Sequence, residues 1–197
     1  MLASWQVFIT GAVLGISIAA PPGPVNAAAA YQVTRSWLAG WATLLGATTA
    51  DAIFFLLTYY GVTGLVVLDN VRNLLFVLGG CLMFYLAYAT LRNFRKEPQE
   101  QKRYGRPYLL GLTIGLSNPF QLAWWIAVGI GMVATFGSSI IFGFFTGILA
   151  WTILFATLLR KSIERYRSMH PFVIYASGLV LLVFGVWLLL TGLLSLL

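Results

Sequence analysis

The sequence predicts an all-α integral membrane protein with six transmembrane helices, arranged as an inverted 3+3 repeat with broken first and fourth helices. Three observations predict this fold: an apolar composition, apolar segments of membrane-spanning length, and a short motif that occurs once in each half. Of the 197 residues, 60% are hydrophobic and 9% are charged, whereas about a quarter of a soluble domain is charged. The chain has too little polar surface to coat a water-soluble globule, so we expect the bilayer to be its solvent.

Six apolar segments are long enough to cross the hydrocarbon core, which requires about 20 residues of helix. Only the connections 92–107 and 160–171 hold appreciable runs of polar residues, so we expect no separate soluble domain. Residues 1–197 are predicted to form a single transmembrane domain, with repeat halves of about 1–91 and 108–197 joined by a basic cytoplasmic loop. The predicted spans are residues 5–34, 37–60, 73–91, 108–136, 138–159 and 172–196.

The first apolar segment has a signal peptide as its alternative interpretation. Signal peptides begin with a basic segment, but no Lys or Arg precedes Arg35 in this chain. We therefore expect the first span to be retained.

Cys81 is the only cysteine, so the chain has no intrachain disulfide and no CxxC motif. Six-span thiol electron carriers need a cysteine pair, which argues against a membrane-embedded redox enzyme. We expect a protein that is not an enzyme. We expect Cys81 to be a small apolar residue packed between helices, and we expect no cofactor.

The basic residues are distributed unevenly between the two sides of the predicted membrane. Eleven of the 12 Lys and Arg residues fall in the loops that follow spans one, three and five, and only Arg72 falls opposite. Such loops stay in the cytoplasm, so we expect both termini outside. The loop 92–107 lacks the interleaved aromatic residues of nucleic-acid sites, so we expect attraction to anionic lipid heads and no nucleic-acid partner.

A short motif relates the two halves: residues 11–17 read GAVLGIS and residues 111–117 read GLTIGLS. Weaker matches pair Gly46 with Gly147 and Gly80 with Gly178. Because each half has three spans, the second half must enter the membrane from the opposite side, as in the inverted repeats of secondary transporters. Small residues and GxxxG motifs also occur in ordinary packed helix bundles. Glycine-rich helix faces could pack within one subunit or between subunits, so a homo-oligomer is possible.

The first copy of the motif is followed by a segment that cannot continue a helix. Pro21, Pro22 and Pro24 lack backbone donors, and Gly23 lets the chain leave helical geometry. Irregular chain at this depth must be buried in protein or line a wet cavity. The helix that resumes near Asn26 would present free N–H groups and the positive end of its dipole, which suit a carboxylate.

The second copy is followed by a similar break, at Asn118 and Pro119, with Gln121 close behind. Asn and Gln both donate and accept hydrogen bonds, so they can hold a zwitterion without carrying charge themselves. A kink used only for packing is the alternative for either break. Two breaks at matching positions of a repeat favour a binding site.

Asp51 is the only acidic residue deep within a predicted span, where a charge costs roughly 3 kcal/mol. Thr48 and Ala47 lie three and four residues earlier, on the same helical face. We therefore expect Asp51 to point into the bundle. It could bind a substrate ammonium, or take up and release a proton, or serve as a neutral, hydrogen-bonded structural acid.

These motifs resemble the lysine exporter (LysE) superfamily, including its homoserine and threonine exporter branch, over essentially the whole chain. The resemblance rests on residues 22–26 (PGPVN) with Gly40, Gly46 and Asp51, and on residues 116–119 (LSNP). Many members have Asp after the Gly-Pro, where this chain has Val25 and then Asn26. A Lys often follows the second Asn-Pro, where this chain has Phe120, so the predicted site is less polar.

The resemblance implies a secondary active transporter that exports amino acids or related small polar metabolites from a prokaryote across its cytoplasmic membrane, driven by protons or the membrane potential. One half would rock against the other around a midplane site. A divalent metal-ion exporter of the same superfamily and a passive channel or scaffold are the alternatives, although one buried Asp does not make a metal site. The predicted substrate-binding residues are Pro22, Gly23, Pro24, Asn26, Asp51, Asn118, Pro119 and Gln121.

Overall fold

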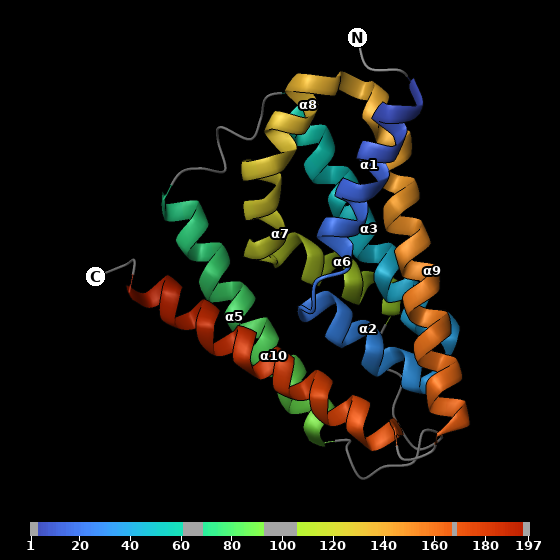
Figure 1. The fold of residues 1–197 in the computed structure, drawn as a ribbon. Coiled ribbons are helices and arrows are strands. Elements are labelled where there is room, and N and C mark those ends of the chain that lie inside the picture. Colours follow the sequence, from blue (N-terminus) through green and yellow to red (C-terminus); the bar gives the residue numbers. More distant parts are fainter. Residues whose placement is uncertain (1–3, 61–68, 93–105, 167–168, 195–197) are drawn as a thin grey trace.

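The structure is a computed structural model that describes residues 4–60, 69–92, 106–166 and 169–194. Within these ranges the chain is helical and contains no strand (Figure 1), so the predicted all-α class is confirmed. In chain order the helices are α1 (Ser4–Ala19), α2 (Pro24–Arg35), α3 (Trp37–Tyr59), α5 (Asp69–Arg92), α6 (Pro107–Ser117), α7 (Pro119–Trp124), a π-helix (Trp125–Gly129), α8 (Ile130–Phe136), a 3-10 turn (Gly137–Ile140), α9 (Ile141–Arg165) and α10 (Met169–Leu194).

Several helices are long and apolar enough to cross a membrane. Within the described residues, three segments meet this test: Trp37–Tyr59, Ile130–Arg165 and Pro171–Leu194. The helices α1 and α2 meet it together as a fourth span that is bent by 76°. Apolar, membrane-spanning helices are therefore confirmed, and the count of six spans stays a prediction.

Prolines and one serine fix where the helices begin. Pro24 and Pro107 occupy the first turns of α2 and α6, where their missing N–H would have no partner in any case. Pro119 begins α7 in the same way. The Ser36 side-chain oxygen accepts a hydrogen bond from the Ala39 N–H at 3.0 Å and so caps the start of α3.

The helices pack in pairs, and each pair joins a helix of the first half of the chain to a helix of the second half. Helix α1 packs along α9, α3 along α6, and α5 along α10, while α2 lies against both α3 and α10. Glycines bring the first two pairs into close contact: a Cβ at Gly147 would collide with the α1 backbone, and one at Gly46 with the α6 backbone. Such small-residue contacts are how membrane helices approach closely.

The α5–α10 pair runs obliquely to α1, α3 and α9 (Figure 1). Its close contacts place Gly80 against Leu189 and Gly178 against Leu91. The expectation that Cys81 packs between helices is wrong, because Cys81 is exposed. It follows Gly80, so its side chain leaves α5 on a face away from this contact.

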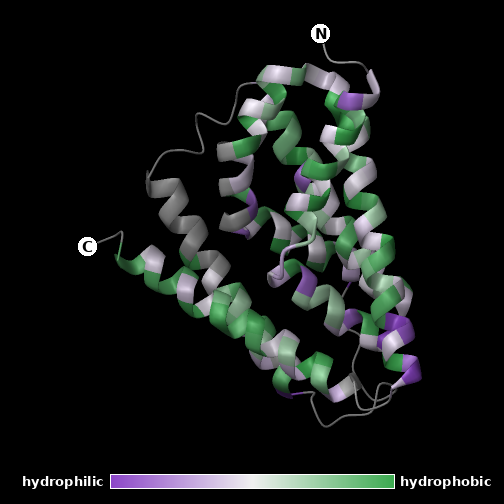
Figure 2. Cartoon of the chain, viewed as in Figure 1, coloured by the Kyte–Doolittle hydropathy of each residue, from purple (hydrophilic) through white to green (hydrophobic). Residues whose placement is uncertain are grey.

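The outer surface is apolar over most of the helices (Figure 2). Large side chains such as Phe142 and Leu154 are 78% and 50% exposed. An exposed apolar surface of this extent would be unfavourable in water and suits contact with lipid.

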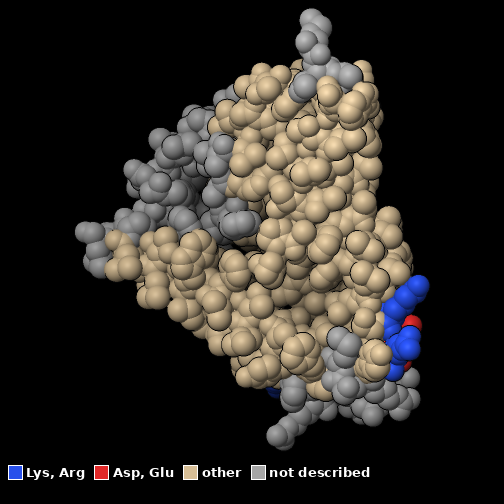
Figure 3. Space-filling model, viewed as in Figure 1, with Lys and Arg blue, Asp and Glu red and all other residues tan. Residues whose placement is uncertain are grey.

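Basic residues gather at one side of the fold. Helices α2, α5 and α9 all end toward the bottom of Figure 1, with Arg35, Arg92 and Arg165 in their last turns. Figure 3 shows the charged side chains of this face clustered at the C-terminal end of α9. The loop residues 93–105 and the side chain of Arg72 lie outside the described residues.

Candidate transport site

The first break lies between α1 and α2, where residues 20–23 are not helical. Asn26 stabilises it: its Nδ2 donates to the carbonyls of Ala19 and Pro21, both at 2.8 Å. Both carbonyls lie where the helix is interrupted and the regular ladder of backbone hydrogen bonds stops, and the Asn26 amide supplies each of them with a donor. Asn26 is 8% exposed, and its Oδ1 is buried with no hydrogen-bond partner among the described atoms.

The second break lies between α6 and α7. Asn118 follows the last residue of α6 and has extended backbone angles, φ −84° and ψ 106°. Pro119 explains this conformation, because a proline disfavours the helical region for the residue before it. Asn118 is buried.

Asp51 lies in the middle of α3 and is 5% exposed. Gln121 donates through Nε2 to Asp51 Oδ1 at 2.7 Å and to the Ala47 carbonyl at 3.3 Å. Trp125 donates through Nε1 to the same Asp51 oxygen at 2.9 Å. In the described part of the chain both donors reach Asp51 Oδ1 and none reaches Oδ2.

Trp125 is positioned by a local irregularity that the sequence analysis did not find. It begins a π-helix, Trp125–Gly129, and such wide turns occur often at functional sites. Its ring is fully buried and meets Phe55 and Phe144 edge-on, with ring centroids 6.1 and 5.3 Å apart. The aromatic pair at 124–125 was visible next to the second break, but the sequence does not show which indole reaches the carboxylate.

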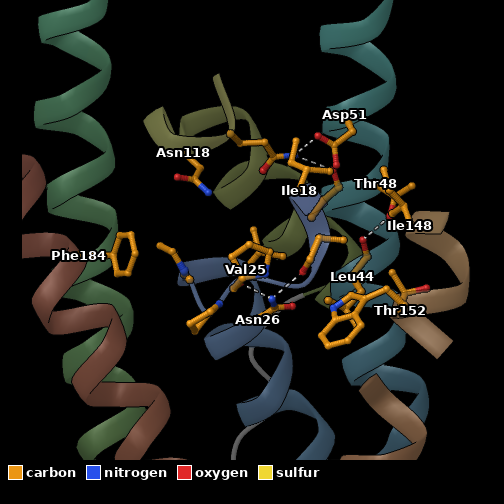
Figure 4. Close-up of a pocket in the computed structure, with 18 residues that line it drawn as sticks. Ile18, Val25, Asn26, Leu44, Thr48, Asp51, Asn118, Ile148, Thr152 and Phe184 are labelled. Carbon is orange, nitrogen blue, oxygen red and sulfur yellow. Dashed lines mark hydrogen bonds between the residues drawn. The ribbon is translucent and has the colours of Figure 1, made fainter. Parts of the chain in front are cut away.

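The two breaks and Asp51 line one cavity of about 80 Å³ (Figure 4). A water needs roughly 10–15 Å³ measured in this way, so the cavity has room for several waters or a small polar group. Pro119 follows Asn118 as the first residue of α7, and its side chain lies outside the described structure. The other predicted site residues all line the cavity: Pro22, Gly23, Pro24, Asn26, Asp51, Asn118 and Gln121.

A larger and more open groove of about 320 Å³ adjoins this cavity. The two share Pro22, Gly23, Asn26 and Trp151 as lining residues. The first break and the Trp151 ring therefore form the boundary between a small polar cavity and a larger groove.

Comparison with known proteins gives the family. Residues 16–192 match the LysE type translocator family. The chain belongs to this family. The matched region of this LysE type translocator includes both breaks and Asp51, and it confirms the resemblance found in the motifs. Members of the family are transporters, so the protein is a membrane transporter and not an enzyme.

One relative of this LysE type translocator is the "Putative amino acid efflux protein YcgF" of Bacillus subtilis (strain 168). The two sequences are 28% identical over 182 residues, which cover 89% of this chain and 74% of that protein. No solved structure matches.

The translocator holds very little charge around its cavities. Asp51 is the only ionisable side chain among the described residues that line either cavity. No group of three His, Cys, Asp or Glu side chains able to hold a metal ion occurs in the searched part of the structure. The polar groups around the described cavities are therefore one carboxylate, several neutral side chains and the ends of broken helices.

Proposed function

We propose that this translocator exports amino acids or closely related zwitterions by alternating access, as a secondary active transporter coupled to protons or to the membrane potential. The observation that carries the proposal is the shared cavity: two broken helices and one carboxylate line the same space. Transporters commonly place substrate sites where such discontinuous helices meet.

The two ends of an amino acid suit different parts of the cavity. The N-terminal turn of α2 has N–H groups that lack helical partners, and it carries the positive end of the helix dipole. These groups suit the substrate carboxylate. Asp51 suits the ammonium, because Gln121 and Trp125 hold Oδ1 in place while Oδ2 has no donor within the described structure.

A single carboxylate also provides a way to couple export to protons. No Lys, Arg or His is among the described lining residues, so Asp51 has no cationic partner of the protein's own there. A buried carboxylate is costly unless it is paired or protonated. Asp51 would therefore hold either the substrate ammonium or a proton, and exchange of one for the other would couple their movements.

Reciprocal glycine contacts support the inverted repeat. Gly147 meets Ala12, whereas Gly46 meets Tyr108 and Leu112. If the motif at 11–17 is aligned with that at 111–117, Leu112 is the counterpart of Ala12, and Gly46 was already paired with Gly147. Exchanging the two halves thus converts the α1–α9 contact into the α6–α3 contact.

The α5–α10 contact is also preserved when the two repeat halves are exchanged. Gly80 meets Leu189, and its counterpart Gly178 meets Leu91. The offset from Gly80 to Gly178 equals the offset from Leu91 to Leu189. We infer six spans in two inverted halves, with one half rocking against the other around the shared cavity.

The basic side of the fold gives the proposed orientation. The last turns of α2, α5 and α9 on that side contain Arg35, Arg92 and Arg165. Helix ends with basic residues are usually on the cytoplasmic side, where they attract anionic lipid heads. We infer an inner-membrane protein with both termini outside.

The experiment is a growth screen followed by flux measurements. Cells that express the protein are exposed to toxic levels of amino acids, dipeptides, amino-acid analogues and divalent metals. We expect protection against one or more amino acids, and flux in proteoliposomes that responds to an imposed pH gradient or potential. Protection against metals alone would indicate a metal exporter, and flux that ignores both gradients would indicate a passive channel.

A further inference from the structure

The larger groove beside the polar cavity has a different chemical character. We propose that it takes the side chain of the transported amino acid, so that the exporter selects amino acids with uncharged, apolar side chains. This inference rests on the function proposed above and specifies its substrate class.

The groove continues directly from the polar cavity. Pro22, Gly23, Asn26 and Trp151 line both spaces, so one small molecule can place its polar end in one and its side chain in the other. The remaining wall of the groove is mainly apolar and comes from α9 and α10. Its aromatic member, Phe155, lies beside Trp151 with ring centroids 5.9 Å apart.

Two residues that line both spaces, Trp151 and Asn26, each hold one polar atom that is buried from solvent. Trp151 Nε1 is a buried donor and Asn26 Oδ1 is a buried acceptor, and neither has a hydrogen-bond partner in the part of the chain that the structure describes. Buried polar atoms are rarely left without partners. A bound amino acid would place its α-carbon at this boundary, since its polar end joins its side chain there.

The charge of the site limits what the side chain can be. Among the described lining residues, Asp51 alone is ionisable, and the substrate ammonium would be its partner. A second charge on the side chain would enter an apolar groove with no opposite charge among its described lining residues, which is unfavourable. Lysine, arginine, glutamate and aspartate are therefore poor substrates, whereas leucine or methionine fits.

The volume of the groove would let the exporter select amino acids by the size of their side chains. Its roughly 320 Å³ lies beyond the smaller polar cavity, and ligand pockets fall in the range of about 300–1,000 Å³. A glycine would leave this space empty of substrate. A branched or thioether side chain would displace water from apolar walls, which favours binding.

The test uses full-length protein in proteoliposomes, preloaded with labelled leucine or alanine. For the wild type, unlabelled leucine and methionine are expected to compete with labelled leucine, and lysine and glutamate in about tenfold excess are not. Ala176 lines the groove from α10, so Ala176→Phe should lower the ratio of leucine to alanine transport at least about tenfold, since one methylene can change selectivity by roughly that factor.

Matched variants separate the possible outcomes. Leu179→Phe lies on the outer face of the same helix, where Leu179 is 46% exposed, and it should leave the ratio unchanged. Phe155→Ala should enlarge the groove and raise phenylalanine transport relative to leucine, and it decides the question if Ala176→Phe does not fold.

Failure of this inference differs from failure of the proposed function. A wild type that moves no amino acid overturns the proposed function. A wild type that moves lysine or glutamate as well as leucine overturns the groove proposal alone. An unchanged leucine-to-alanine ratio in Ala176→Phe would also overturn it.

Discussion

Replacing Asp51 with Asn tests the role of the buried carboxylate with little change in shape. An Asn side chain keeps the oxygen that accepts from Gln121 at 2.7 Å and from Trp125 at 2.9 Å. Hydrogen bonds to a charged group contribute about 1.5–3 kcal/mol and neutral ones about 0.5–1.5 kcal/mol, so two weakened bonds lose roughly 2–3 kcal/mol. Removal of a buried charge offsets this loss, and we expect the variant to fold.

The effect on transport should be much larger than the effect on folding. The Asn amide nitrogen would face the cavity in place of Oδ2, so it would meet a substrate ammonium with a donor instead of an acceptor. Removing one partner of a buried charge pair costs about 2–5 kcal/mol, which corresponds to at least about a 30-fold loss of affinity. Coupling to a pH gradient should be lost as well.

The assay is uptake of a labelled amino acid into proteoliposomes, with and without an imposed pH gradient. Asp51→Glu serves as the matched control, because it keeps the carboxylate. We expect Asp51→Glu to retain a gradient-dependent flux and Asp51→Asn to lose it. Equal gradient-driven flux in Asp51→Asn and the wild type would remove the carboxylate from the mechanism.

Further variants test the helix packing, the donor to Asp51 and the contact between α9 and the end of α2. Gly147→Val should lower thermal stability by about 1–3 kcal/mol, because its Cβ would strike the α1 backbone, whereas Gly131→Ala, with open space around it, should change it little. Trp125→Phe should keep the aromatic packing but remove the donor to the Asp51 carboxylate, so the transport rate should fall. Trp124→Phe is the matched control and should keep the wild-type transport rate. Arg160→Ala should cost about 1 kcal/mol in thermal unfolding, because Arg160 Nη1 donates to two carbonyls at the end of α2, at 3.3 and 3.5 Å.

Each of these variants has a result that would contradict the reasoning. A Gly147→Val protein as stable as Gly131→Ala would mean that α1 and α9 do not touch closely. Equal transport by the two tryptophan variants would mean that the indole donor is dispensable. An unchanged melting temperature for Arg160→Ala would show that its side chain does not tie α9 to α2.

The breaks could be predicted from the sequence because their cause is local. Prolines remove backbone donors wherever they occur, so the end of α1 before Pro21 and the extended Asn118 before Pro119 followed from the chain alone. Asp51 was also identifiable, since a lone acidic residue within an apolar span is costly wherever it lies.

The missed features depend on contacts between distant segments. Trp125 reaches Asp51 from 74 residues away, through a π-helix that the aromatic pair does not specify. Trp151 joins the cavity only because α9 packs beside the first break. The error at Cys81 has a similar origin, because adjacent residues of an apolar helix can face either lipid or protein, and hydropathy does not distinguish the two.

Both broken helices should enclose one water-filled space, and labelling of introduced cysteines tests this directly. In a Cys81→Ser background, Thr48→Cys and Asn118→Cys place thiols on the cavity wall, while Phe142→Cys places one on the outer face, where Phe142 is 78% exposed. We predict that a membrane-impermeant thiol reagent modifies the first two, that the transported amino acid protects both, and that Phe142→Cys stays unmodified in the bilayer. Unreactive thiols at both positions 48 and 118, or labelling there that the amino acid does not slow, would contradict the shared cavity.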